Sequence, residues 1–204
     1  MRSPRPRRRR VLAAAALLPF LALAACVSSS EVRETERDGY AVASPVLKRE
    51  IDQRIENLKY LHGKDLRASM ARLIYIGEPA IPALVDVLAS HDPKTRGSAS
   101  YILGEIGDKR AIPAISGLLD DPVEFVRLEA AGALATLGDW TCLPTLIGAL
   151  RHDNAAIRLK AFQVLLTQVK QDFGYVYNAP ASERERAVER WEAWWKTAHA
   201  ENLL

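Results

Sequence analysis

The first residues with recognisable chemistry lie near the start of the chain, around Cys26. Six arginines occupy positions 2–10, and residues 11–25 form an apolar run of 15 residues. A membrane-spanning helix needs about 20 apolar residues, so this run is too short for one, but it has the length of the apolar part of an export signal. The pattern therefore predicts that residues 1–25 are a cleavable export signal and that Cys26 becomes the first residue of the mature chain.

The sequence Leu23-Ala24-Ala25-Cys26 resembles the lipobox of bacterial lipoproteins. The resemblance implies that the Cys26 thiol takes a diacylglyceryl group and that the freed amine is acylated, which gives a stable anchor because a single acyl chain holds a protein only weakly. Val27 stands where enterobacterial lipoproteins retained in the inner membrane have aspartate. We therefore expect the periplasmic side of the outer membrane, with the inner membrane as the alternative. A plain secretory signal and a retained membrane helix are the other interpretations of this segment.

Residue types that carry catalysis or hold metals are sparse in the rest of the chain. His91-Asp92 and His152-Asp153 are adjacent histidine–aspartate pairs, but they fall on turns about two helical units apart, on the order of 20 Å. One metal ion needs donors within about 4 Å of each other, so the two pairs cannot share it. The sequence also has no Gly-x-Ser-x-Gly motif and no glycine-rich phosphate loop. We expect no enzyme activity, no metal and no cofactor.

The charge balance depends on whether the export signal is counted. The full chain has 28 Lys and Arg against 25 Asp and Glu, a net charge of +3. Removing residues 1–25 takes away six arginines and no acid, which leaves 22 basic and 25 acidic residues and a net charge of −3. The basicity belongs to the signal, and it gives no support for nucleic-acid binding, which needs a basic face.

An internal repeat with a period of 31 residues organises the middle of the chain. Cys142 aligns with Ala80 and Ala111 in this register, which predicts a small, buried packing position for its side chain. The repeat also aligns six further sets of residues, namely Pro82, Pro113 and Pro144; Leu84, Ile115 and Leu146; Leu88, Leu119 and Leu150; Arg96, Arg127 and Arg158; Ala99, Ala130 and Ala161; and Leu103, Leu134 and Leu165.

Each repeat unit predicts two helices joined by a short turn. The proline opens the first helix at its first position, where a missing N–H costs nothing. The turn carries Asp92-Pro93, Asp121-Pro122 or Asp153-Asn154, whose side chains are suited to cap the second helix. Gly107 and Gly138 close the second helices.

The units resemble HEAT-like repeats of the short, phycobilisome-lyase type. The segment AIPAISGLLDDPVEFVRLEAAGALATLGD, residues 111–139, carries nearly every feature, and the resemblance covers about residues 64–171. It implies an all-α fold, a short α-solenoid in which stacked helical hairpins bury one continuous core. It does not imply a single function, because such repeats serve as binding scaffolds in many systems.

The segments on either side of the repeats complete the predicted organisation. Residues 26–44 are polar and predict a flexible tether; residues 45–172 form the repeat domain, which starts with a helix capped at Ser44-Pro45 and ends with one that reaches Gln171. Residues 173–204 predict an aromatic loop and a tryptophan-rich helix that covers the last repeat. Ser182-Glu183-Arg184-Glu185 has the pattern of a capping box for that helix.

Several side chains are candidates for binding a partner. The arginine series at positions 96, 127 and 158 predicts bonds between neighbouring repeats, with a basic stripe for an acidic partner as the alternative. The Trp191-Trp194-Trp195 cluster predicts a capping face, with Trp195 or Tyr177 partly open to a partner. The second helices are expected to line the concave face with outward residues that vary between repeats. The candidate partner-binding residues are Arg96, Arg127, Arg158, Tyr101, Tyr177 and Trp195, and the outward positions of the second helices are Ser98, Tyr101, Glu129 and Lys160.

Taken together, the sequence predicts a monomeric, membrane-anchored scaffold lipoprotein that binds another protein of the cell envelope. Two alternatives remain. One is a lyase-like or chaperone-like accessory acting on a cofactor-bearing protein, which a wide hydrophobic groove would favour. The other is a purely structural envelope lipoprotein. A flat, polar and patchy concave face would favour the scaffold.

Overall fold

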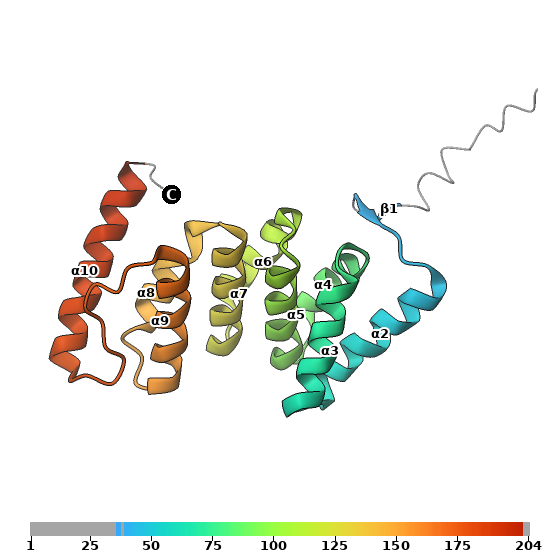
Figure 1. Cartoon of the computed structure of the whole chain (residues 1–204), viewed down its shortest axis with the longest axis horizontal. Coiled ribbons are helices and arrows are strands. Elements are labelled where there is room, and N and C mark those ends of the chain that lie inside the picture. Colours follow the sequence, from blue (N-terminus) through green and yellow to red (C-terminus); the bar gives the residue numbers. More distant parts are fainter. Residues whose placement is uncertain (1–35, 38, 202–204) are drawn as a thin grey trace, which may run out of the picture.

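The computed structural model of the chain describes residues 36–37 and 39–201 and packs nine α-helices of this part in a row of helical hairpins (Figure 1). The all-α solenoid is therefore confirmed. The α-helices are α2 (Pro45–Tyr60), α3 (Gly63–Ile76), α4 (Ile81–Asp86), α5 (Pro93–Ile106), α6 (Ile112–Ser116), α7 (Glu124–Leu137), α8 (Leu143–Ala149), α9 (Ala155–Val169) and α10 (Ala181–Ala200). The short elements are the strands β1 (Glu36–Arg37) and β2 (Tyr40–Ala41) and the 3₁₀ turns η1 (Glu78–Ala80), η2 (Val87–Ala89), η3 (Lys109–Ala111), η4 (Gly117–Asp120) and η5 (Trp140–Cys142).

The first α-helix of each repeat begins one residue before its proline. A 3₁₀ turn comes first, and the α-helices α4, α6 and α8 then carry Pro82, Pro113 and Pro144 as their second residue. The prolines still lie in the first turn, where their fixed φ suits the helix and their missing N–H has no intrahelical partner to lose. The prediction of proline at the first position was wrong by one residue.

The second helices are capped by different residues of the turn. Asp92 caps α5 by accepting a 2.9 Å hydrogen bond from the Thr95 N–H, and Asn154 rather than Asp153 caps α9. Asp121 does not cap α7, because Val123 occupies the cap position. The C-terminal caps Gly107 and Gly138 are confirmed in the left-handed conformation, with φ of 82° and 80°.

One continuous core runs through the stack from the β-hairpin to α10. The second helices α5 and α7 approach closely because Gly104 has no side chain: a Cβ there would lie 2.7 Å from the Ala133 Cα. Burial of a large apolar side chain contributes roughly 1.5–3 kcal/mol, so this core supplies the stability that a disulfide cannot. Its fully buried members include Leu58, Leu73, Leu84, Leu103, Ile115, Leu134, Leu146, Leu165 and Trp191.

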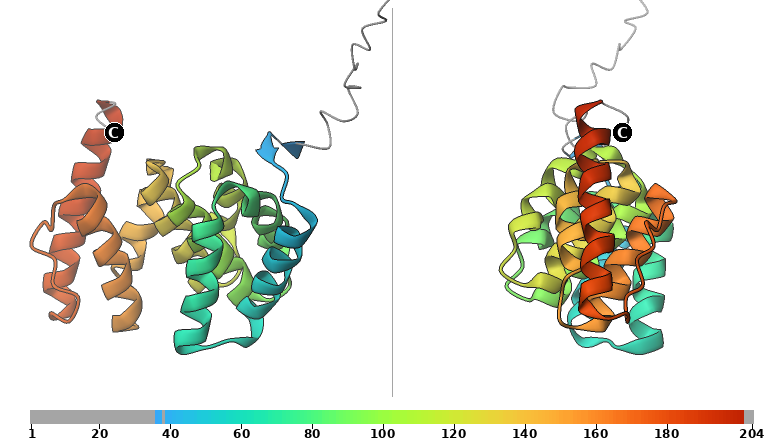
Figure 2. Two further views of the ribbon diagram at one scale, coloured as in Figure 1. Left: turned by 45° about the vertical axis from the view of Figure 1, so that its right-hand side comes forward. Right: turned by 90° about the vertical axis from the view of Figure 1, so that its left-hand side faces the viewer.

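The helix α10 covers the open end of the last repeat, as the end-on view shows (Figure 2). Trp191 is fully buried and packs edge-on against Phe173 at 4.6 Å between ring centroids. On the rim, Arg151 of the last repeat forms ion pairs with Glu185 and Glu192 of α10 at 2.6 Å each. The tail therefore closes a stack whose last apolar face would otherwise meet water.

Two details of the C-terminal part differ from the prediction. The helix α9 ends at Val169, two residues short of Gln171, because Lys170 adopts a left-handed conformation with φ of 60°. The Ser182 capping box is also wrong: α10 starts at Ala181 behind Pro180, whose backbone begins the helix without a side-chain cap. Ser182 thus already lies inside the first turn.

The β-hairpin before α2 packs against the repeats. Tyr40 is only 6% exposed, and the Arg110 guanidinium of η3 lies 4.2 Å from its ring centroid. Arg110 also donates to the Gly39 carbonyl and to the carboxylates of Glu78 and Asp108. The folded part therefore starts before residue 45, because Tyr40 buries its ring where the prediction has tether. Cys26, the export signal and residues 26–35 lie outside the described residues.

Candidate binding surface

A groove of two adjoining pockets runs across the second helices of the repeats. The first pocket, of about 480 Å³, is lined from α3, α5, α7 and Lys160 of α9, and the second, of about 350 Å³, from α5, α7 and α9. Tyr101, Glu129 and Lys160 line both, so the two pockets adjoin each other. We call them the apolar pocket and the polar pocket, and together the second-helix groove.

Large apolar side chains line the apolar pocket. Met70 and Ile74 of α3 are half-buried at its floor, while Tyr101 and Phe125 are 40% and 44% exposed. Aromatic residues and methionine are enriched where proteins bind other proteins, because they bury a large area with few rotatable bonds. Their exposure here marks a surface that a partner could cover.

The position of Phe125 is fixed by its neighbours. Its ring lies over Gly97 of α5, where an added Cβ would come within 2.6 Å of the Phe125 Cε1. The Lys160 ammonium lies 5.5 Å from the ring centroid and also forms an ion pair with Glu129. An exposed aromatic ring held in one place loses little conformational entropy on binding.

The polar pocket offers hydrogen-bonding groups. Among them are the amides of Gln163 and Gln168 and the hydroxyls of Thr136 and Thr167. Tyr101 stands between the two pockets, and burial raises the pKa of its phenol, with the carboxylates of Glu105 and Glu129 acting in the same direction. The phenol therefore stays neutral at physiological pH and can donate a hydrogen bond.

The structure brings together the four outward positions expected on the second helices. Tyr101, Glu129 and Lys160 line both pockets, and Ser98 lines the apolar pocket. The prediction of Ser98 as an outward side chain was wrong, because it is only 6% exposed where the helices pack. Phe125, the most exposed aromatic side chain of the groove, was not among the predicted residues. A signal for it existed in the glycine at position 97, since a glycine in the interior of a helix indicates a close neighbour.

The three repeated arginines do not line either pocket. Arg96, Arg127 and Arg158 each donate through Nη1 to the backbone carbonyl six residues earlier, at distances of 2.7, 2.7 and 2.6 Å. Arg96 also forms a bidentate pair with Asp121 of the next repeat, and Arg158 donates to the Tyr177 carbonyl of the tail. The expected bond between neighbouring repeats is thus present at Arg96, whereas Arg127 bonds within its own repeat and Arg158 bonds the tail.

The remaining candidates lie elsewhere. Tyr177 is half-buried beside α9, and Trp195 is half-buried beside His199, with 5.0 Å between ring centroids. Trp195 lines a separate pocket of about 420 Å³ together with Trp140. The structure thus separates these two side chains from Tyr101.

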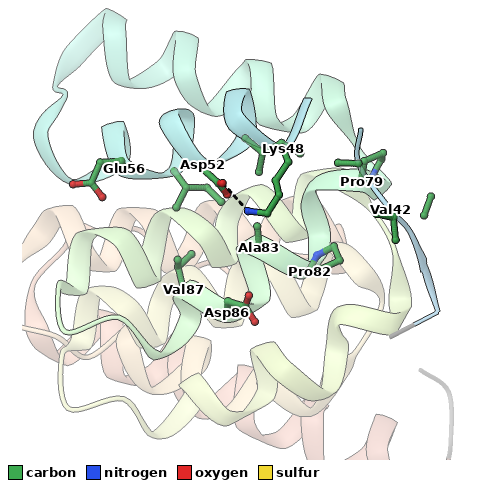
Figure 3. Close-up of a pocket in the computed structure, with 13 residues that line it drawn as sticks. Val42, Lys48, Asp52, Glu56, Pro79, Pro82, Ala83, Asp86 and Val87 are labelled. Atoms are coloured by element: carbon green, nitrogen blue, oxygen red, sulfur yellow. Dashed lines mark hydrogen bonds and ion pairs between the residues drawn. The ribbon is translucent and has the colours of Figure 1, made fainter. Parts of the chain in front are cut away.

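Another pocket, of about 290 Å³, lies between α2, α4 and the segment that follows β2 (Figure 3). Lys48 forms a 2.7 Å ion pair with Asp52 at its edge. Its apolar wall includes Ile51 and Ile55, which are 1% and 8% exposed. These side chains belong to the core, so this pocket displays less apolar surface than the groove.

Among the described residues there is no assembled metal site and no activated cysteine nucleophile. No group of three His, Cys, Asp or Glu in this part of the chain is placed to hold a metal ion. Cys142 is fully buried, as its place in the repeat predicts, and burial raises the pKa of its thiol to about 12. A buried thiol that stays protonated is a poor nucleophile.

The comparison with protein families bears on the repeats directly. Residues 57–135 match the family model of HEAT repeats. The match runs from the end of α2 into α7 and so covers most of the helices that line the apolar pocket. No curated protein sequence matches the chain. Among the described residues, no helix is long and apolar enough to cross a membrane.

Proposed function

We propose that this protein is a non-catalytic HEAT-repeat scaffold, anchored to a membrane of the cell envelope by lipid on Cys26, that binds a protein partner through the second-helix groove. The observation that carries the binding proposal is the pair of exposed aromatic rings, Tyr101 and Phe125, beside the half-buried Met70. HEAT repeats generally bind proteins, and an apolar patch of this kind is costly to leave in water unless a partner covers it.

The anchoring proposal is supported by the sequence alone. The basic segment, the 15-residue apolar run and Leu23-Ala24-Ala25-Cys26 together have the pattern of a lipoprotein signal. Residue 27 is valine, which favours the periplasmic side of the outer membrane over the inner membrane. A lipid at Cys26 would confine the repeats to a membrane surface, where they meet membrane partners at raised effective concentration.

The groove favours a protein segment over a large apolar cofactor. The groove is hollowed and partly apolar, so it is neither flat nor a continuous hydrophobic channel. The Glu129–Lys160 ion pair lies where its two pockets meet. A protein segment that alternates apolar and polar side chains fits such a surface better than the apolar ring system of a client's cofactor.

The anchor is tested by the exchange Cys26→Ser. We expect the wild-type chain to incorporate labelled palmitate and the variant to lose the label and to stay unprocessed or become soluble. Cys142→Ser is the matched control, because it removes the other cysteine and should keep the label. Labelling of the Cys26→Ser variant would refute the anchor.

The binding surface is tested by affinity purification from cross-linked envelope membranes. Exchanging an exposed aromatic side chain at the centre of an interface weakens binding by about tenfold or more. We expect Phe125→Ser to lose the co-purified partner. Tyr75→Ser is the control, because Tyr75 is 81% exposed and lines neither pocket. Equal recovery with Phe125→Ser and wild type would contradict the proposal.

A further inference from the structure

The apolar pocket carries a charge opposite to that of the mature chain. Its charged side chains are three cations and one carboxylate, whereas the chain without residues 1–25 has 22 basic and 25 acidic residues. A positive pocket on a negative protein attracts anionic groups selectively. The residues responsible are Arg67, Lys94, Lys160 and Glu129.

The three cationic side chains differ in the hydrogen bonds and ion pairs that they form within the protein. Lys160 pairs with Glu129, and Lys94 donates to the carbonyls of Leu61 and Lys59 at the end of α2. Arg67 is exposed and forms no ion pair within the part of the chain that the structure describes. Its guanidinium can therefore bind an incoming carboxylate through two parallel hydrogen bonds, which is the geometry that arginine favours.

Arg67 stands beside the apolar floor rather than apart from it. Arg67, Met70 and Ile74 are three and seven residues apart on α3, which places them along one face of the helix. Phe125 faces them from α7. An anion bound at Arg67 would thus lie next to an apolar group that rests on Met70, whose flexible side chain adapts to different shapes.

Building on the proposed function, we infer that the apolar pocket recognises an acidic segment of the partner protein that carries one large apolar side chain. The apolar side chain lies on Met70, Ile74 and Phe125, and a neighbouring carboxylate binds Arg67. Neither feature is sufficient alone, because a carboxylate on an exposed arginine binds weakly and an apolar contact does not select the charge of its neighbours.

Selection of peptides tests this inference without knowledge of the natural partner. The probe is a phage library of random dodecapeptides, selected on the purified mature chain in detergent. We expect enrichment of peptides in which Leu, Ile, Phe or Trp is flanked by Asp or Glu. Arg67→Glu should weaken their binding by about tenfold or more. Arg49→Glu, on an exposed position of α2 outside the pocket, is the charge-matched control and should leave binding unchanged.

Several outcomes would overturn the inference. The inference is wrong if the enriched peptides carry basic or uncharged flanking residues. It is also wrong if the library yields no binders, or if Arg67→Glu leaves peptide binding unchanged. A second variant, Phe125→Ser, should weaken the same peptides while Arg49→Glu binds normally. The Cys26→Ser chain is also sedimented with phosphatidylglycerol vesicles. If it binds the vesicles through Arg67 and binds no peptide, the ligand of the pocket is a lipid headgroup and the inference of an acidic peptide is wrong. If non-acidic peptides were selected while Phe125→Ser still lost the envelope partner, only the inference would fail and the proposed function would stand.

Discussion

At the scale of single residues, the repeated arginines show how a regular polar series can be structural. Residues 90 and 121 cap the first helices of their repeats, residue 152 lies three residues after the end of α8, and the arginine six residues later donates to the carbonyl of each. A carbonyl at a helix end lacks an intrahelical partner, so a charged donor there stabilises the turn. Arg96 adds a direct bond to Asp121 of the following repeat.

The Arg96–Asp121 pair gives a prediction about pH. The guanidinium of Arg96 lowers the pKa of Asp121, so the carboxylate contributes stability above its unfolded pKa of about 3.9 and loses it as the pH falls through the lower folded value. Asp121→Asn should cost about 1–3 kcal/mol at neutral pH. Urea unfolding should also show a smaller loss of stability in acid for the variant than for the wild type.

The control for this prediction is an exposed pair. Lys48 and Asp52 are also 2.7 Å apart, but their side chains are 65% and 50% exposed. Asp52→Asn should therefore change the free energy of unfolding far less than Asp121→Asn. Equal effects of the two exchanges would show that the buried pair does not link the repeats.

At the scale of elements, the helix pairs could be predicted from the sequence because several signals agree. Apolar spacing, the glycine after each second helix and the 31-residue register all indicate the same hairpin. The errors fall at helix ends, where local alternatives differ little in energy: Pro180 starts α10 ahead of the expected Ser182 cap, and Lys170 ends α9 early. The β-hairpin was missed because a short polar segment gives no period, and only Tyr40 signals its burial.

The close approach of α5 to α7 predicts that exchanging Gly104 for alanine destabilises the protein. Alanine is favoured over glycine in a helix by about 1 kcal/mol, yet Gly104→Ala should destabilise the protein by about 1–3 kcal/mol because its methyl group would meet the Ala133 backbone at 2.7 Å. Gly132→Ala in α7 is the matched control, since its Cβ would lie 3.7 Å from Val164. It should leave stability unchanged or raise it, and thermal melting separates the two outcomes.

If α10 caps the stack, exchanging its buried tryptophan should lower the free energy of unfolding more than exchanging its half-buried one. Trp191→Ala should cost about 3–5 kcal/mol, because the side chain is fully buried against Phe173 and Trp194. Trp191→Phe should cost less, since it keeps an aromatic ring and removes a buried indole N–H that has no hydrogen-bond partner among the described residues.

Trp195→Ala is the control, because its side chain is only half-buried. It should lower the melting temperature less than Trp191→Ala. A Trp191→Ala variant that melts like the wild type would show that α10 does not cap the stack.

At the scale of the whole molecule, the groove depends on packing that the repeat pattern does not contain. The outward positions Tyr101, Glu129 and Lys160 followed from helix periodicity, whereas Ser98, predicted with them, is buried. Phe125 did not, because its exposure depends on how α7 lies across Gly97. The positive charge of the apolar pocket could not be predicted from the sequence either. Arg67, Lys94 and Lys160 come from three helices and meet only in the folded stack.

The position of the β-hairpin also bears on the proposed lipid anchor. Arg110 holds the β-hairpin on the first repeats, so the packed part of the chain includes Tyr40 and does not begin at residue 45. Nine residues lie between Cys26 and Glu36, and the ten residue-to-residue steps of such a segment span at most roughly 35 Å. A lipid anchor would thus keep the groove close to the membrane surface.

The most direct test of the account is cross-linking in living cells from within the groove. A photoreactive benzophenone side chain is introduced at position 101 and, as a control, at position 75, which is more exposed but outside both pockets. The account predicts a discrete adduct with an envelope protein from position 101 and none from position 75. No adduct at position 101, or the same adducts at both positions, would contradict it.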